Sequence, residues 1–217
     1  MLPGVSDDSL RAYGSTIEET RADLFGLYYL ADQKLVDLGL TPNMEAYKSQ
    51  YYSYMMNGLL TQLVRIKPGE NIEEAHMRNR SLITHWVYEN GKDDNVVELA
   101  TVNNKTYVKI NDYEALRGLF GKLLAEIQRV KSEGDFKAAR ELVETYAVKV
   151  DPTIHKEILE RYEKLHISPY KGFINPQYEA VTDKDGKITD VKITYGESYE
   201  DQMLRYSRDY ATLPYVN

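Results

Sequence analysis

Three acidic side chains gather in one short segment near the start of the chain: Glu18 and Glu19 are adjacent, and Asp23 follows. On a helix, at about 100° per residue, Glu19 and Asp23 share one face and Glu18 lies on the neighbouring face. Carboxylates placed in this way bind a metal ion, pair with a cation such as Arg21, or cap the helix and favour its positive N-terminus. Capping is far commoner than metal ligation, so the residues alone favour the structural interpretation.

A histidine and an arginine occur four residues apart at His76 and Arg80, so they project from one face of a helix. A shared binding site needs this kind of spacing. A histidine on a charged helix face is, however, more often a solvated or salt-bridged surface residue. Both interpretations remain open from the residues alone.

The remaining histidines do not form a metal site in the sequence. The chain has no cysteine, which leaves histidine and the acidic residues as the metal ligands to consider. No HExxH or similar pair occurs. We interpret His85, beside Trp86, as a packing residue, and we expect His155 and His166 to lie on helix surfaces.

Two segments resemble the dipeptidyl peptidase III family of zinc peptidases. Residues 18–23, Glu-Glu-Thr-Arg-Ala-Asp, resemble the family motif EExR(A/K)(D/E), and the continuation through Tyr29 is similar to bacterial members. Residues 75–80, Ala-His-Met-Arg-Asn-Arg, resemble the family segment AHMxxR. The resemblance extends along essentially all of the chain, including Asn175-Pro176 and the last helix around residues 199–204.

The resemblance implies a role for each motif residue. Glu19 corresponds to the third zinc ligand of the family. Glu18 and Asp23 correspond to acidic residues that orient the zinc-bound histidines, a role that requires a fixed acceptor behind each ring. His76 corresponds to the residue that steadies the developing oxyanion, and Arg80 to the residue that holds the substrate.

One departure from the family pattern is larger than any substitution. The motif HExxGH, which supplies two histidine ligands and the general-base glutamate, is absent here, as is the substrate-binding partner lobe. We therefore expect the chain to be the C-terminal portion of a longer zinc peptidase, beginning shortly after the HExxGH helix. The parent would release dipeptides from the N-terminus of oligopeptides. The chain alone should be inactive, bind zinc weakly or not at all, and self-associate through surfaces that the missing lobe covers.

Helices should position the motif residues. A first helix is predicted from a capping box at Ser15 and Glu18 to about Asp37, and its stretch 24–31 is apolar all round, which is typical of a buried helix. The acidic residues on it are therefore expected to be buried. His76 and Arg80 fall on a helix that starts near Asn71. Further helices are predicted at about 42–66, 112–131, 136–147, 153–165 and 199–210, with hairpins at about 97–110 and 178–195.

These elements predict one predominantly helical α+β unit over residues 1–217, with about seven helices and two small β-hairpins, as the C-terminal part of a metallopeptidase catalytic lobe. The formal charge of −7 argues against nucleic-acid partners, and no stretch is long enough to span a membrane. The absence of cysteine fits a reducing, cytoplasmic location. The alternative function is a non-catalytic helical binding or assembly domain, in which the acid-rich helix is only core.

Overall fold

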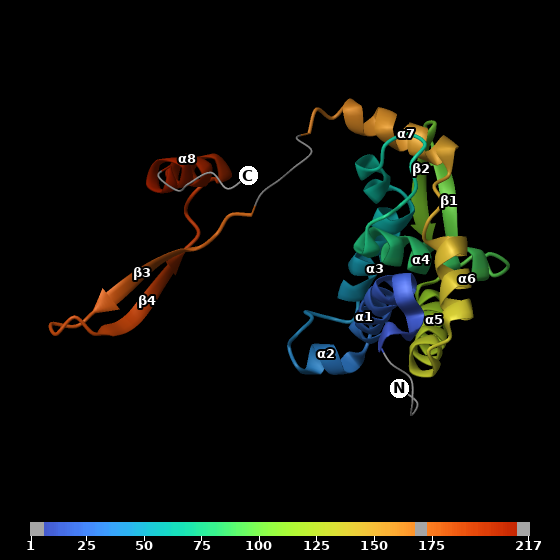
Figure 1. Ribbon diagram of the computed structural model, residues 1–217, viewed down its shortest axis with the longest axis horizontal. Coiled ribbons are helices and arrows are strands. Elements are labelled where there is room, and N and C mark those ends of the chain that lie inside the picture. Colours follow the sequence, from blue (N-terminus) through green and yellow to red (C-terminus); the bar gives the residue numbers. More distant parts are fainter. Residues whose placement is uncertain (1–6, 168–172, 212–217) are drawn as a thin grey trace. The chain divides into compact units, whose positions relative to one another are not determined.

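A computed structural model describes residues 7–167 and 173–211, and these residues form an α-rich α+β fold (Figure 1). The predicted class is confirmed, with two antiparallel hairpins and, among the described residues, eight α-helices where about seven were expected. The elements are 3₁₀ helices Asp7–Tyr13 and Thr61–Arg65, helices α1 Gly14–Leu30, α2 Gln33–Asp37, α3 Ala46–Leu59, α4 Ala75–Asn90, α5 Tyr113–Glu133, α6 Phe136–Tyr146, α7 Pro152–Glu163 and α8 Tyr199–Tyr210, and strands β1 Val97–Val102, β2 Lys105–Ile110, β3 Gln177–Thr182 and β4 Ile188–Thr194.

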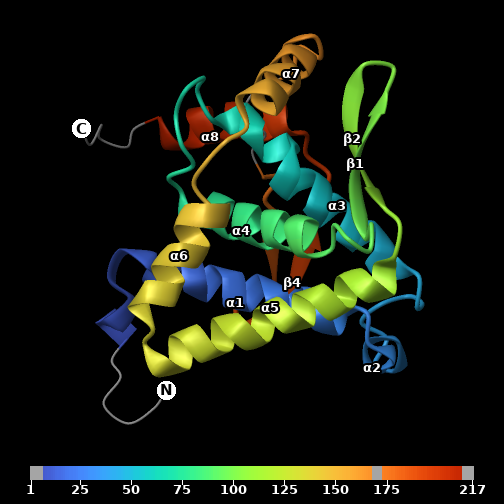
Figure 2. The ribbon, with the colours of Figure 1, turned by 90° about the vertical axis from the view of Figure 1, so that its right-hand side faces the viewer.

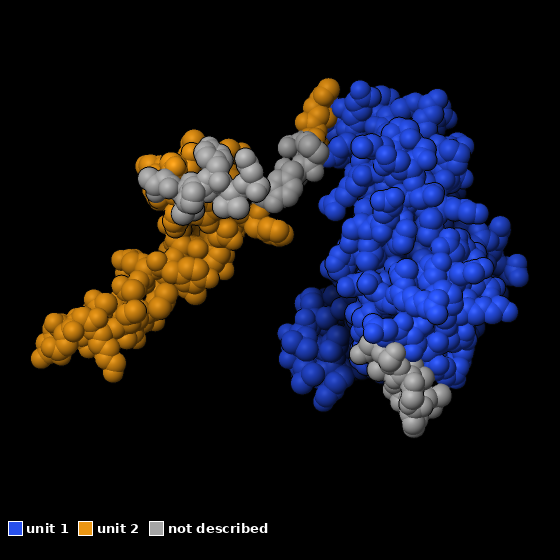
Figure 3. All heavy atoms as spheres, in the orientation of Figure 1, with its two compact units in different colours: residues 1–165 blue, residues 166–217 orange. Residues whose placement is uncertain are grey.

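The chain divides into two compact units (Figure 3). Unit 1 comprises Met1–Leu165 and unit 2 comprises His166–Asn217. Among the described residues, the buried hydrophobic side chains all come from unit 1, between Leu10 and Ile158. The organisation as a single unit over 1–217 stays a prediction from the sequence.

The first predicted helix is two helices. Helix α1 ends at Leu30, and α2 starts after Asp32, whose extended backbone and side chain cap it by accepting a hydrogen bond from the backbone N of Lys34 at 2.9 Å. The predicted capping box at Ser15 is wrong, because α1 starts at Gly14 without a side-chain cap. Glu18 instead forms ion pairs, which withdraw its carboxylate from the helix N-terminus.

The helices that face α1 are also shorter than predicted. The second predicted helix consists of α3 and the 3₁₀ helix 61–65, separated at Leu60. Helix α4 starts at Ala75 because Glu74 caps it, accepting hydrogen bonds from the backbone N of His76 at 2.9 Å and of Met77 at 3.0 Å. This cap fixes the first turn of α4, which carries His76.

Helix α1 packs against α4 and α5, and α3 packs against α4 (Figure 2). The inner face of α1 is fully covered at Ile17 and Leu24. Its other face is open: the side chains of Phe25 and Tyr29 are 54% and 44% exposed. The expectation that α1 is buried all round is therefore wrong, because α1 has neighbouring helices on its inner face while Phe25 and Tyr29 face outward.

The first hairpin packs against α3 and α4 and is also hydrogen-bonded to α7. Strands β1 and β2 pair in register from Val97 opposite Ile110 to Val102 opposite Lys105. The backbone N and Oγ1 of Thr106 both donate to the carboxylate of Glu157 on α7, at 2.7 and 2.5 Å. The hairpin thereby becomes part of the packed unit.

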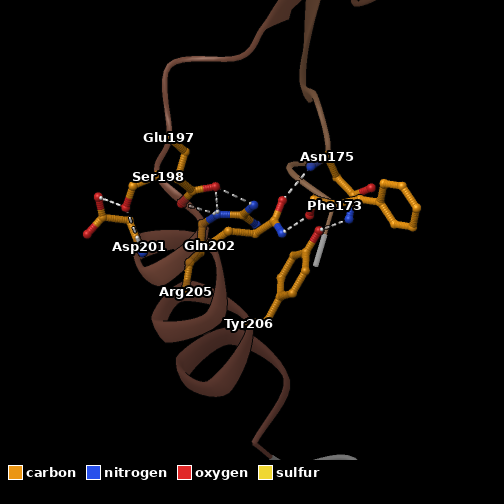
Figure 4. A network of polar contacts seen from close by, with 8 residues as sticks. All are labelled: Phe173, Asn175, Glu197, Ser198, Asp201, Gln202, Arg205 and Tyr206. Atoms are coloured by element: carbon orange, nitrogen blue, oxygen red, sulfur yellow. Dashed lines mark hydrogen bonds and ion pairs between the residues drawn. The ribbon is translucent and has the colours of Figure 1, made fainter. Parts of the chain in front are cut away.

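Unit 2 contains the hairpin β3–β4 and helix α8, and polar contacts join α8 to the segments before β3 and after β4 (Figure 4). Gln202 on α8 is fully buried; its Nε2 donates to the carbonyl oxygen of Phe173 at 2.7 Å, and its Oε1 accepts from the backbone N of Asn175 at 2.5 Å. Arg205 pairs with Glu197 at 2.9 Å. None of the helices described is both long and apolar enough to cross a membrane.

Candidate functional site

The neighbouring acids Glu18 and Glu19 on α1 have different partners. Glu18 accepts from Arg21 at 2.6 Å and from Lys131 of α5. These two cations, Arg21 first, lower the pKa of Glu18 to about 2. The Glu18 carboxylate is thus held as an anion in a local ion-pair cluster that ties α1 to α5.

Glu19 meets the second motif. Its Oε2 lies 3.1 Å from Nδ1 of His76 on α4, and the two side chains are 37% and 60% exposed. No lysine or arginine pairs with Glu19 among the residues that the structure describes. The carboxylate that the family resemblance selects as a metal ligand is therefore partly open to solvent and not neutralised by a fixed cation.

Asp23, one turn further along α1, is held by two other helices. The Tyr54 hydroxyl on α3 and the Asn79 Nδ2 on α4 both donate to Oδ2 of Asp23, each at 2.8 Å. Burial, and then the negative charge of Asp23, raise the pKa of Tyr54 well above its usual range. Asn79 is only 1% exposed, and its Oδ1 is buried without a hydrogen-bond partner in the described part of the chain.

Arg80 follows Asn79 on α4. Its positive charge acts on Tyr54, where it opposes the rise in the pKa of the hydroxyl. Its backbone oxygen accepts from Oγ1 of Thr84 at 2.7 Å, a contact within α4. The structure thus brings Glu19, Asp23, His76 and Arg80 to adjoining turns of the packed pair α1 and α4, while Glu18 is engaged toward α5.

The other histidines are structural where they are buried. His85 Nδ1 lies 2.9 Å from the carbonyl oxygen of Ser81, and burial lowers the pKa of His85, in line with a packing role. The expectation for His155 is wrong: it is buried, and its Nε2 lies 3.1 and 3.0 Å from the carbonyl oxygens of Leu63 and Ile66, so it fixes the end of the 3₁₀ helix 61–65. His166 is exposed but lies beyond α7, in a left-handed backbone conformation with φ 49°.

The described residues do not complete a metal site. Among them, no group of three or more histidine, cysteine, aspartate or glutamate side chains is arranged to hold a metal ion. Glu19 fits as one ligand, since a carboxylate oxygen suits zinc and the side chain that it pairs with, His76, is charged only when protonated. The other metal ligands would have to come from residues outside those that the structure describes.

Sequence reasoning did not find Tyr54 and Asn79. Tyr54 follows Tyr47 and Tyr51 in a tyrosine-rich helix and looks like one more packing residue. Asn79 occupies a variable position of the segment AHMxxR. Only the tertiary contact of α1, α3 and α4 brings both side chains to Asp23.

Comparison with known proteins assigns the family. A model of peptidase family M49 matches residues 5–201, most of the chain. The chain belongs to peptidase family M49. Membership of this metallopeptidase family confirms the resemblance that the two motifs indicated, and the motif residues lie within the matched range.

A solved structure supports the M49 fold. The chain is similar to the structure of DPP III from Caldithrix abyssi, with a TM-score of 0.53 and 24% sequence identity. The match covers 71% of this chain and 26% of that chain, so this M49 chain spans about a quarter of its solved relative. A comparison with curated proteins found no match.

Proposed function

We propose that this chain is the part of an M49 zinc dipeptidyl peptidase that supplies one metal ligand, Glu19, and two substrate-facing residues, His76 and Arg80. The substrates would be oligopeptides with a free N-terminus, from which dipeptides are released. The observation that carries the proposal is the contact between the two motifs, in which His76 of α4 lies 3.1 Å from Glu19 of α1. Family membership gives this contact its chemical meaning.

Each residue would act through chemistry that its side chain already has. When bound, zinc supplies Lewis-acid chemistry that activates water and polarises the scissile carbonyl. His76, 60% exposed and on the same side as Glu19, would donate a hydrogen bond to the oxygen that becomes negative. Arg80 would bind the peptide backbone through its guanidinium donors, four residues along the same helix. Asp23 would accept a hydrogen bond from a ligand histidine and so fix its ring.

The two histidine ligands and the general base would come from an HExxGH helix in the part of the enzyme that this sequence does not contain. One carboxylate binds zinc weakly, because structural and catalytic zinc sites use three or four protein ligands. We therefore propose that the 217-residue chain alone has no dipeptidyl peptidase activity. Its expected partners are the missing lobe and a peptide substrate.

The test is zinc binding by the full-length enzyme. Competition with a chelator should show that Glu19→Ala weakens zinc affinity by at least tenfold, since the site loses a ligand. Glu73→Ala, at an exposed glutamate just before α4, is the matched control and should leave the affinity unchanged. Unchanged zinc affinity in Glu19→Ala would overturn the ligand assignment and favour the alternative of a non-catalytic helical binding or assembly domain.

Self-association is a separate expectation. Large apolar side chains are exposed in both units, including Phe25 and Tyr29 in unit 1 and Phe173 and Leu204 in unit 2. Exposed apolar patches of more than a few hundred Å² promote association. We expect the isolated chain to form oligomers at high concentration, and light scattering showing a clean monomer would contradict this.

A further inference from the structure

The carboxylate of Asp23 is hydrogen-bonded by side chains from two neighbouring helices. Asp23 lies on α1, but both described donors come from other helices, Tyr54 from α3 and Asn79 from α4. Their two bonds end on the same oxygen, Oδ2. The second oxygen, Oδ1, is left to accept from a further donor, since a carboxylate accepts up to about four hydrogen bonds.

Asn79 and Tyr54 can each act only as a hydrogen-bond donor toward Asp23. A carboxylate offers no hydrogen, so Asn79 must present its NH₂ to Asp23 and turn its own oxygen away. That oxygen is buried without a partner in the described chain, although a buried acceptor left unpaired costs about 1–3 kcal/mol. The raised pKa of Tyr54 keeps its hydroxyl protonated and able to donate. Oδ1 of Asp23, one helical turn from Glu19 on α1 and on a side chain that is not fully buried, therefore remains as an acceptor for an N–H donor.

We propose that Tyr54 and Asn79 are positioning residues that clamp Asp23 so that its second oxygen receives the ring N–H of a metal-binding histidine from the rest of the enzyme. This inference rests on the proposed function, because the histidine belongs to the proposed zinc site. It adds two residues outside the acidic motif. Asn79 lies between His76 and Arg80 on α4, so the clamp also couples α1 to the helix that carries the substrate-facing residues.

Tyr54→Phe tests the clamp because it removes only the hydroxyl. In the full-length enzyme, zinc affinity measured by chelator competition should fall by about tenfold, since partners that orient metal ligands are worth about 10–100-fold in affinity. The matched control is Tyr47→Phe, on the same helix, which removes a buried hydroxyl that donates to Glu114 at 3.2 Å, away from the motif. Tyr47→Phe should lower thermal stability but leave zinc affinity unchanged.

A double-mutant cycle separates positioning from general destabilisation. In an Asp23→Ala background, Tyr54→Phe should cause no further loss of zinc affinity, because the clamp acts through Asp23. Asn79→Leu, which removes both donor and acceptor, should behave in the same way and serves as a second variant. Additive losses in the cycle, or zinc affinities of Tyr54→Phe and Tyr47→Phe that match, would overturn the proposal.

The outcome also distinguishes this inference from the proposed function. If Glu19→Ala weakens zinc binding but Tyr54→Phe and Asn79→Leu do not, the zinc site stands and the clamp is wrong. If Glu19→Ala has no effect, the proposed function itself is wrong. Melting temperatures of the metal-free variants, measured in parallel, report folding independently of zinc.

Discussion

The imidazole Nδ1 of His76 lies 3.1 Å from Oε2 of Glu19, and this contact joins the two family motifs across helices α1 and α4. The same carboxylate is the proposed zinc ligand. If Glu19 binds zinc as proposed, His76 would lie next to a metal ligand, where it could contact a bound substrate. We therefore expect His76 to act in catalysis and Glu19 in metal binding, two roles that can be measured separately.

His76→Ala is predicted to reduce turnover without reducing zinc affinity. Loss of a hydrogen-bond donor to a developing oxyanion costs about 10²–10³ in kcat. Zinc affinity should stay the same or rise, because the neighbour that contacts Glu19 is gone. Steady-state kinetics and chelator competition on the full-length enzyme measure the two effects. Unchanged kcat would refute the oxyanion role, and a parallel loss of zinc would make His76 part of the metal site.

The carboxyl of Glu18 should make stability depend on acid pH. Ion pairs with Arg21 and Lys131 lower its pKa from 4.5 to about 2 in the folded state. A depressed pKa gives stability that is complete above about pH 4.5 and is lost as the pH falls towards 2. The side chain is 41% exposed, so solvent screening keeps the contribution below about 1 kcal/mol.

Urea unfolding of this chain at about pH 6 and about pH 3 measures that contribution. Glu18→Gln should lower stability at the higher pH and show a smaller loss on acidification than the unaltered chain. Added salt should reduce the difference between the two proteins. Equal acid sensitivity of both proteins would show that the ion pairs do not contribute.

At Gly58, α3 lies close against α4. A Cβ atom at this position would lie 2.4 Å from Cγ2 of Thr84 and 2.9 Å from the backbone oxygen of Arg80. Gly58→Ala should therefore destabilise the chain by about 1–3 kcal/mol through overpacking. Thr84→Ala in the same protein should restore part of the loss, since it removes the two nearest side-chain atoms.

Gly118 on α5 provides the matched control for Gly58. A Cβ atom there would meet nothing within 4 Å, so Gly118→Ala should stabilise the helix by about 0.5–1 kcal/mol. Denaturant midpoints of the two variants should shift in opposite directions. A stabilised Gly58→Ala protein would show that α3 and α4 are not packed as closely as described.

The sequence predicted those elements whose local signals agree with their tertiary surroundings. Asn103 and Asn104 adopt left-handed φ values of 50° and 58°, the conformation that a tight hairpin turn requires and that asparagine tolerates. The last helix was expected at about 199–210, and Ser198 caps it by accepting from the backbone N of Asp201 at 3.1 Å. In both cases a few adjacent residues are enough to predict the local structure.

Prediction failed where distant contacts decide the outcome. The break at Asp32 lies inside a helical pattern, and the side chain that makes it also pairs with Arg117 of α5 at 3.4 Å. The open face of α1 looks like core in sequence, since nothing local distinguishes Phe25 from Leu24. The motifs singled out Glu19 and His76, whose side chains lie together in the structure, but the bonds of Tyr54 and Asn79 to Asp23 depend on the packing of three helices.

Gln202 should control the local stability of unit 2. Its amide bonds the backbone on both sides of Ile174, at Phe173 and Asn175 (Figure 4). Gln202→Leu would remove two hydrogen bonds to the backbone, each worth about 0.5–1.5 kcal/mol. The backbone N of Asn175 should then exchange its hydrogen about 10–100-fold faster, as the opening free energy falls. Met203→Ala, at an exposed neighbour on α8, should leave that rate unchanged, and equal rates in all three proteins would show that Gln202 does not hold the segment to α8.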